Sequence, residues 1–314
     1  MSAGHHHHHG HEHGGHHHHA PPAPGNAGRA FAIAVTLNLI FVAAEIAAGF
    51  MSGSMALLAD AGHNLSDVLS LLLAWGASVL AARPPSARFT YGLKSSSILA
   101  AIANATLLWV AVGAILVETV RRFAEPAPVA GTTMMIVAGI GIVINALSAL
   151  LFAKGSKSDL NLRAAFVHLM ADAVVSVGVV VAGLIVLLTG FELIDPIASL
   201  VITAVIAWSS WGVLRDSLRM GMLGVPDNID ESKVRVHLEH LPGVERVHDL
   251  HIWPMSTTET ALTAHLVMPG GPPGDGFLRD LAHDLEHRFG IGHPTIQIET
   301  EGACSCPLES EALV

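Results

Sequence analysis

Two histidine–aspartate pairs with the same spacing lie inside apolar segments of the chain. His63 and Asp67 form one pair, and His168 and Asp172 form the other. Residues four apart share one face of a helix, so each pair presents an imidazole and a carboxylate together. Such residues are expensive in a bilayer, where they usually face a cavity, an ion path or each other. Because two imidazoles and two carboxylates suit a tetrahedral divalent metal, the repeated spacing favours one zinc site over two isolated hydrogen-bonded helix contacts.

The composition indicates a membrane protein. Hydrophobic residues make up 51% of the 314 residues and charged residues only 13%, whereas soluble domains carry about 25% charged residues. The formal net charge of −10 belongs to the last third of the chain, because residues 1–221 hold equal numbers of acidic and basic residues. An acidic soluble part argues against nucleic acid as a partner and suits a cation.

Six apolar segments are each long enough to cross about 30 Å of hydrocarbon as a helix. They lie near residues 30–50, 55–81, 95–117, 130–153, 163–189 and 194–214. Nine Lys and Arg residues flank these segments on one side, and only Arg121 and Arg122 lie on the other. Because basic residues accumulate on the cytoplasmic side, we expect both termini to be cytoplasmic in a multi-pass inner (plasma) membrane protein that contacts lipid. The transmembrane part is predicted to span residues 29–221.

Residues 222–300 have the pattern of a small α+β domain. Helices are expected at 230–241 and 277–289, and strands at 245–253, 259–268 and 294–300. This α-β-β-α-β order suggests that both helices cover one face of a sheet.

The two ends of the chain are predicted to lie outside these domains. Residues 1–28 hold 11 histidines and should be disordered. Gly and Glu interrupt this tract, which favours a native metal-gathering segment over a purification tag. Residues 301–314 form a flexible tail with the only cysteines, Cys304 and Cys306. These thiols are either zinc ligands or incidental, and their spacing is unsuited to a structural disulfide.

Four further polar residues lie within the apolar segments. Asp60 precedes His63 by three residues, so it can fix the imidazole tautomer of His63 or serve as a structural hydrogen-bond partner. For Asn38, Glu45 and Asn145 we favour hydrogen bonds between helices.

Five stretches of the sequence together resemble one transporter family. They read GSMALLADAGHNLSDVLSLLLAWGA, RFTYG, NLRAAFVHLMADAVVSVGV, VHDLHIW and GIGHPTIQIE. In this order they resemble the cation diffusion facilitator family of zinc/proton antiporters, most closely its zinc-selective bacterial branch, from about residue 30 to residue 300. The resemblance implies a bundle of six transmembrane helices, a C-terminal cytoplasmic ferredoxin-like domain and a homodimer. It also implies a transport site made of His63, Asp67, His168 and Asp172.

The resemblance also bears on selectivity and on a loop metal site. Family members with aspartate in place of His63 tend to handle a wider range of metals, so His63 favours zinc, with cadmium and cobalt as further candidates. Many relatives carry a histidine in the loop after the second span. Leu93 and Lys94 occupy that region here, so we expect no metal site there.

Three histidines match the family's cytoplasmic metal sites, namely His248, His265 and His283. Where some relatives carry a His-x-Asp pair on the last strand, this chain has Gln297 and Glu299. The resemblance therefore implies a cytoplasmic zinc site of altered or weaker binding, with Glu299 as a ligand.

The predicted function is secondary active transport rather than catalysis. No GxxxxGK[ST] motif occurs, so a gradient rather than ATP should drive the cycle. Histidine can exchange a proton for a metal near neutral pH, which predicts efflux of zinc against protons by alternating access. An intramembrane zinc enzyme is disfavoured because HExxH is absent and four ligands close the metal shell. A metal store would not need six spans.

Overall fold

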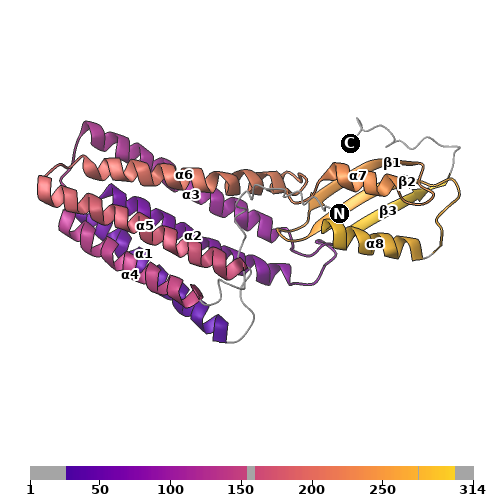
Figure 1. Ribbon diagram of the computed structural model, residues 1–314, viewed down its shortest axis with the longest axis horizontal. Coiled ribbons are helices and arrows are strands. Elements are labelled where there is room, and N and C mark those ends of the chain that lie inside the picture. Colours follow the sequence, from indigo (N-terminus) through magenta and orange to yellow (C-terminus); the bar gives the residue numbers. More distant parts are fainter. Residues whose placement is uncertain (1–25, 154–159, 275, 301–314) are drawn as a thin grey trace, which may run out of the picture.

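The computed structural model describes residues 26–153, 160–274 and 276–300. Six long helices form an elongated bundle, and the remaining elements form a lobe at one end of it (Figure 1). The bundle helices are α1 (Asn26–Ser52), α2 (Met55–Ala81), α3 (Ser96–Ala124), α4 (Gly131–Ala153), α5 (Leu160–Thr189) and α6 (Ile194–Gly221). The lobe contains α7 (Glu231–Glu239), β1 (Arg246–Pro254), β2 (Thr260–Val267), α8 (Gly276–Phe289) and β3 (His293–Glu299).

All six bundle helices are long and apolar enough to cross a membrane, which confirms the predicted number of spans. Two helices run further than their hydrophobic patterns suggested. Helix α3 continues to Ala124, because Glu118 pairs with Arg122 across one turn and the buried Thr119 hydroxyl bonds to Ser199 of α6 at 2.9 Å. Helix α6 continues to Gly221, beyond the apolar segment, and carries the chain towards the lobe.

The bundle turns far from the lobe bring the starts of α2 and α6 together. Gly53 joins α1 to α2 and Gly190 ends α5, and both adopt a positive φ that L-residues rarely tolerate. The first residues of α2 contact Asp195 in the first turn of α6. Because this end lies opposite the lobe, α2 runs towards the lobe and α5 runs away from it (Figure 1).

Helices α4 and α5 pack closely through glycine. A Cβ atom on Gly131 of α4 would lie 2.7 Å from the carbonyl oxygen of Gly183 of α5, and one on Gly183 would lie 3.0 Å from the carbonyl oxygen of Gly131. Small residues let helix backbones approach, which is the usual basis of helix association in lipid. The pairing with α4 therefore fixes the position of α5, which carries one of the histidine–aspartate pairs.

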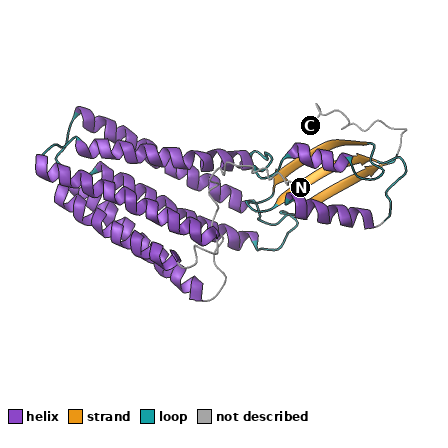
Figure 2. Ribbon diagram, in the orientation of Figure 1, coloured by secondary structure: helices purple, strands orange, loops and turns teal. Residues whose placement is uncertain are grey.

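The lobe is a three-stranded sheet with both helices on one face (Figure 2). Strand β2 is central, antiparallel to β1 and parallel to β3. Apolar residues of the helices and strands form one buried core, which includes Val234, Leu238, Leu262, Leu266 and Leu285. The predicted α-β-β-α-β order is confirmed. The predicted fold class, a six-helix membrane bundle followed by a small α+β domain, is confirmed as well.

The α2–α3 connection holds the lobe against the bundle. Lys94 forms an ion pair with Glu259 in the turn between β1 and β2. The backbone N–H of Thr257 in the same turn donates to the Ser97 hydroxyl at 3.1 Å. Lys94 therefore takes part in a contact between the two parts of the chain.

A second ion pair closes the α6–α7 linker on itself. Arg219, in the last turn of α6, pairs with Asp227 in the linker. The guanidinium holds the pKa of the Asp227 carboxyl below its usual range. Because Asp227 is exposed, this ion pair should contribute little to the free energy of unfolding, and its main effect is on the conformation of the linker.

Candidate metal centre

The two histidine–aspartate pairs meet inside the helix bundle, His63 and Asp67 from α2 and His168 and Asp172 from α5. His63 Nε2 lies 3.4 Å from an Asp172 oxygen and 3.8 Å from an Asp67 oxygen. His168 Nε2 lies 3.2 Å from an Asp67 oxygen and 3.6 Å from an Asp172 oxygen. Each imidazole therefore sits between two carboxylates, and the four side chains form a closed ring.

The spacing of this ring suits a tetrahedral metal ion. Ligand atoms about 2.0 Å from zinc at tetrahedral angles lie about 3.3 Å from one another. The four nitrogen–oxygen separations, from 3.2 to 3.8 Å, lie close to that value. Donor atoms of His63, Asp67 and Asp172 all lie within 4.8 Å of one another. Only small movements of the side chains would complete the coordination sphere.

Exposure of the four side chains changes along the bundle axis. Asp67 and His168, on the side of the ring nearer the lobe, are 33% and 42% exposed. His63 and Asp172, on the opposite side, are only 18% and 6% exposed. The two side chains nearer the lobe are therefore more exposed than the two farther from it.

Further buried polar groups lie on the far side of the ring from the lobe. Asp60 is fully buried and accepts a hydrogen bond from Ser176 of α5 at 3.1 Å. Glu45 of α1 is also fully buried and accepts one from Asn64 at 3.2 Å. The expectation that Glu45 bonds between helices is confirmed. Asp60 has a structural partner in Ser176, and no hydrogen bond between Asp60 and His63 occurs among the described residues.

The end of the bundle opposite the lobe is tied together by one carboxylate. Asp195 is fully buried and accepts from the Ser54 hydroxyl at 2.5 Å. It also accepts from the backbone N–H groups of Met55 at 2.7 Å and Ala56 at 3.2 Å. Backbone N–H groups at a helix start lack partners within the helix, and an anion there is stabilised by the helix dipole. Asp195 thus fixes the start of α2, eight residues before His63.

A second cluster of metal-binding residue types lies on the open face of the lobe's sheet. His248 and His265 are directly opposed on β1 and β2, and their side chains point away from α7 and α8. Glu299 of β3 bridges them, with one oxygen 3.0 Å from His248 Nε2 and the other 3.1 Å from His265 Nδ1. Donor atoms of these three residues lie within 4.8 Å of one another. Three of the four predicted cytoplasmic ligands, His248, His265 and Glu299, therefore converge.

Two neighbours of this cluster were not anticipated. Asp249 accepts contacts from His251 Nε2 at 2.8 Å and from His265 Nε2 at 3.4 Å. Asp249 occupies an irregular point of β1, where its φ of 51° turns the chain out of register. A bulge of this kind redirects a side chain, and no local sequence signal other than the His-Asp-x-His spacing marks it.

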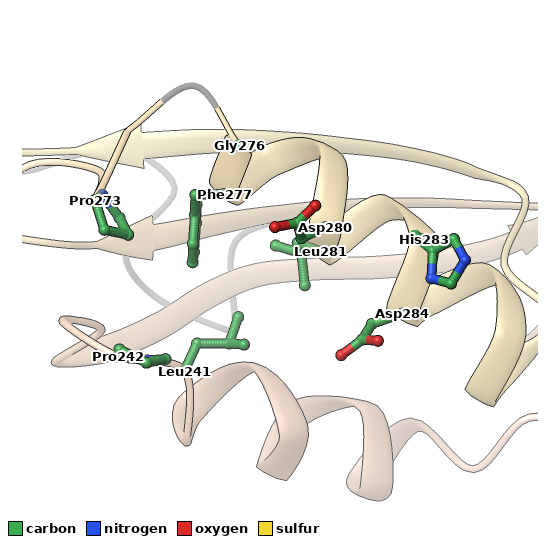
Figure 3. A pocket seen from close by; sticks show the side chains of 9 residues that line it. All are labelled: Leu241, Pro242, Pro273, Gly276, Phe277, Asp280, Leu281, His283 and Asp284. Carbon is green, nitrogen blue, oxygen red and sulfur yellow. The ribbon is translucent and has the colours of Figure 1, made fainter.

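His283 does not join this cluster within one chain. It lies on α8, where its ring stacks on that of His287 at 3.9 Å between centroids. There it borders a pocket of about 500 Å³ between α7 and α8, on the face of the sheet opposite the cluster (Figure 3). Apolar side chains of Leu241, Phe277 and Leu281 line the pocket, with Asp280 and Asp284 beside them.

Some predicted residues fall outside the described part of the chain. Cys304 and Cys306 belong to residues 301–314, and the histidine tract belongs to residues 1–25. Within the described residues, no histidine lies in the α2–α3 connection, where Lys94 instead pairs with Glu259.

Two family models match the chain, one over each part. The cation efflux transmembrane domain matches residues 31–220, and the cation efflux protein cytoplasmic domain matches residues 226–301. Their junction coincides with the linker between α6 and α7.

Several curated proteins are similar to almost the whole chain. A cadmium, cobalt and zinc/H(+)-K(+) antiporter of Bacillus subtilis is 38% identical over 82% of this chain and 84% of its own length. The zinc transporter ZitB of Escherichia coli is 37% identical over 88% of this chain and 89% of its own length. The metal-bound C-terminal domain of the Cupriavidus metallidurans CzcD transporter has been solved. It is 35% identical, covers 23% of this chain and 99% of that domain, and gives a TM-score of 0.21.

Proposed function

Since the chain belongs to the cation efflux family, which makes it a multi-pass membrane transporter that exports metal cations, we propose that it moves zinc out of the cytoplasm in exchange for protons. The observation that carries this proposal is the ring of two imidazoles and two carboxylates between α2 and α5. The ring lies within apolar spans, where ionisable residues are retained for ion pathways.

Zinc is the metal that the ring suits best. Imidazole nitrogen and carboxylate oxygen are ordinary zinc ligands, and four of them make the tetrahedral shell that zinc prefers. Magnesium and calcium favour shells made wholly of oxygen, so two histidines disfavour them. The names of similar proteins include cadmium and cobalt, which accept the same ligands, and we propose these metals as secondary substrates.

Proton exchange follows from the chemistry of the ligands. An imidazole binds a metal only in its neutral form, and free histidine has a pKa of about 6.5. Zinc entering the ring must therefore release any proton held there, and protons arriving from the outside favour release of zinc. The greater exposure of Asp67 and His168 supports a ring that receives zinc from the cytoplasmic side in this conformation.

Zinc movement across a sealed membrane tests this function directly. We expect reconstituted protein to transport zinc, and the rate to rise several-fold when the side receiving zinc is made acidic. A zinc-sensitive dye trapped in proteoliposomes measures the flux, with and without a pH gradient. If the rate ignores the gradient while zinc still moves, proton exchange is wrong. If zinc binds without crossing, the protein is a sensor or a store.

We also propose that the cytoplasmic cluster of His248, His265 and Glu299 binds zinc and that two copies of the chain form a homodimer. The cluster faces away from the lobe's helices, on a sheet face that another copy can cover. Within one chain it offers three ligands, which leaves a coordination position for a further donor. His283, which points elsewhere in its own chain, remains a predicted ligand only if the second copy supplies it. Zinc bound at this face should then draw the two lobes together.

Replacing His265 with alanine tests the cytoplasmic site. Because this imidazole contacts both Glu299 and Asp249, we expect zinc affinity at the lobe to fall by about 10- to 100-fold. Equilibrium dialysis of the full-length protein, with the transmembrane ring disabled, measures the remaining sites. His240→Ala is the matched control, because His240 is exposed and bonds only to the Val236 carbonyl among the described residues. Equal binding by both variants would exclude His265 as a ligand.

The remaining expectations concern the organisation of the chain. We propose that residues 29–221 transport the metal and that residues 222–300 bind metal and dimerise. We further propose that both termini are cytoplasmic in a protein of the inner membrane. In this arrangement residues 1–28 gather zinc near the cytoplasmic mouth, and residues 301–314 form a flexible tail in which Cys304 and Cys306 can bind zinc weakly.

A further inference from the structure

Two acidic side chains are buried inside the membrane-spanning bundle, and neither forms an ion pair with a Lys or Arg among the described residues. Glu45 of α1 and Asp60 of α2 are both fully buried. Asn64, which donates to Glu45 at 3.2 Å, lies one helical turn from Asp60 on the same face of α2, so the two acidic side chains face each other across α1 and α2. Asp60 precedes His63 by one helical turn, on the side away from the lobe. The pair therefore lies between the zinc ring and the outer end of the bundle.

The hydrogen bonds of the pair account for only half of its oxygen atoms. Asn64 donates to Glu45 Oε2, and Ser176 donates to Asp60 Oδ2. Within the described part of the chain, Glu45 Oε1 and Asp60 Oδ1 are buried and have no hydrogen-bond donor. Buried polar atoms are nearly always satisfied. A single proton held between Oε1 and Oδ1 would satisfy both.

Electrostatics require a positive charge at this position. Two ionised carboxylates buried side by side repel strongly in a medium of low dielectric constant, so such a pair is expected to hold one proton or one cation. The charged groups that face the pair are His63 of α2 and Asp172 of α5, and no hydrogen bond or ion pair among described residues joins it to either. The described part of α4 contains no ionisable residue.

The neighbouring groups favour a proton over a metal cation. Asn64 presents its amide N–H to Glu45, and Ser176 presents its hydroxyl hydrogen to Asp60. A metal cation would instead need oxygen lone pairs to point towards the pair. Donors directed at the carboxylates stabilise one negative charge, which is what remains when two carboxylates share one proton.

We propose that the Glu45–Asp60 pair binds one of the protons that the protein exchanges for zinc. The proton arrives from the outer side and is held between the two carboxyl groups while the ring is empty. Zinc in the ring places positive charge one helical turn away, which disfavours the shared proton, and the proton is released to water. By reciprocity, the protonated pair weakens zinc binding and so promotes release of zinc. This inference rests on the proposed proton exchange and assigns it a site separate from the metal ligands.

Two variants test the pair, with infrared difference spectroscopy as the direct readout. Wild-type protein should show the carbonyl stretch of a protonated carboxyl that disappears when zinc binds. In Glu45→Gln and Asp60→Asn this signal should be absent, because an amide then donates to the remaining carboxylate. In proteoliposomes both variants should still bind zinc. Their zinc flux should be about the same with and without an acidic outer side, so the stimulation seen in the wild type is lost. Thr203→Val, an isosteric change at a buried hydroxyl of α6, is the matched control and should retain the stimulation.

The outcomes separate the proton site from the proposed function. If Glu45→Gln and Asp60→Asn keep both the infrared signal and the stimulation, the pair is not the proton site. If the wild-type flux ignores the pH gradient, the proposed exchange fails first. If the variants do not fold, the wild-type spectrum decides. A wild-type spectrum that lacks a zinc-sensitive carboxyl signal would overturn the proposal. Flux driven by a potassium gradient with no such signal would mean that the pair holds a metal cation.

Discussion

Zinc transport should fall by on the order of 100-fold or more when Asp172 is replaced with alanine. Asp172 is the most buried member of the ring, 6% exposed, and its two oxygens face His63 and His168 separately. Its removal therefore takes away one zinc ligand and one of the two carboxylate contacts of each imidazole. The remaining ligands carry one negative charge instead of two, so zinc should bind more weakly as well as move more slowly. Zinc uptake into proteoliposomes at several zinc concentrations measures both effects.

The control for this experiment is another acidic residue that lies outside the ring. Asp216 on α6 pairs with its neighbour Arg215 at the surface, so Asp216→Asn should leave the flux unchanged. The variant His63→Ala should match Asp172→Ala, because both remove a ligand from the same four-residue shell. Flux in Asp172→Ala at half the wild-type rate or above, with protein correctly inserted, would show that zinc crosses elsewhere.

The part of the site that depends on helix periodicity could be predicted from the sequence. A spacing of four residues places His63 beside Asp67 and His168 beside Asp172 in any helix, and the apolar surroundings identify the spans. Nothing in that pattern shows that α2 and α5 face each other. The convergence depends on long-range packing, such as the approach of Gly131 to Gly183 that fixes α5 on α4, and on turns that return the chain.

Strand register explains which of the predicted cytoplasmic ligands come together. His248 and His265 face each other because β1 and β2 pair antiparallel in one register, and Glu299 shares their face on β3. A shift by one residue would have turned all of these side chains into the core. The bulge at Asp249 and the position of His283 on the opposite face of the sheet depend on the same tertiary register, which single-sequence patterns do not contain.

Loss of the Asp195 carboxylate should produce the largest effect on stability. Asp195→Ala leaves the Ser54 hydroxyl and the N–H groups of Met55 and Ala56 without their acceptor in a fully buried site. At about 1 to 3 kcal/mol for each unsatisfied donor, we expect a loss of roughly 3 kcal/mol or more. The melting temperature of Asp195→Ala in detergent should be about 5–10 °C below that of the wild type. The melting temperature of Asp195→Asn should lie between those of the wild type and Asp195→Ala, because one acceptor oxygen remains.

Asp195→Ala should also affect the zinc ring, because α2 begins at this carboxylate and carries His63 eight residues later. Helices α2 and α6 are held together at their outer ends by Asp195, whereas the ring joins α2 to α5. We therefore expect Asp195→Ala to weaken zinc affinity although it contacts no ligand. Ser54→Ala removes one donor to Asp195 and the N-cap acceptor of the Leu57 N–H, but it keeps the carboxylate on the Met55 and Ala56 N–H groups, and it should cost about 1 kcal/mol. Equal melting temperatures for Asp195→Ala and Ser54→Ala would mean that the two backbone contacts contribute nothing, and that α2 is fixed by packing alone.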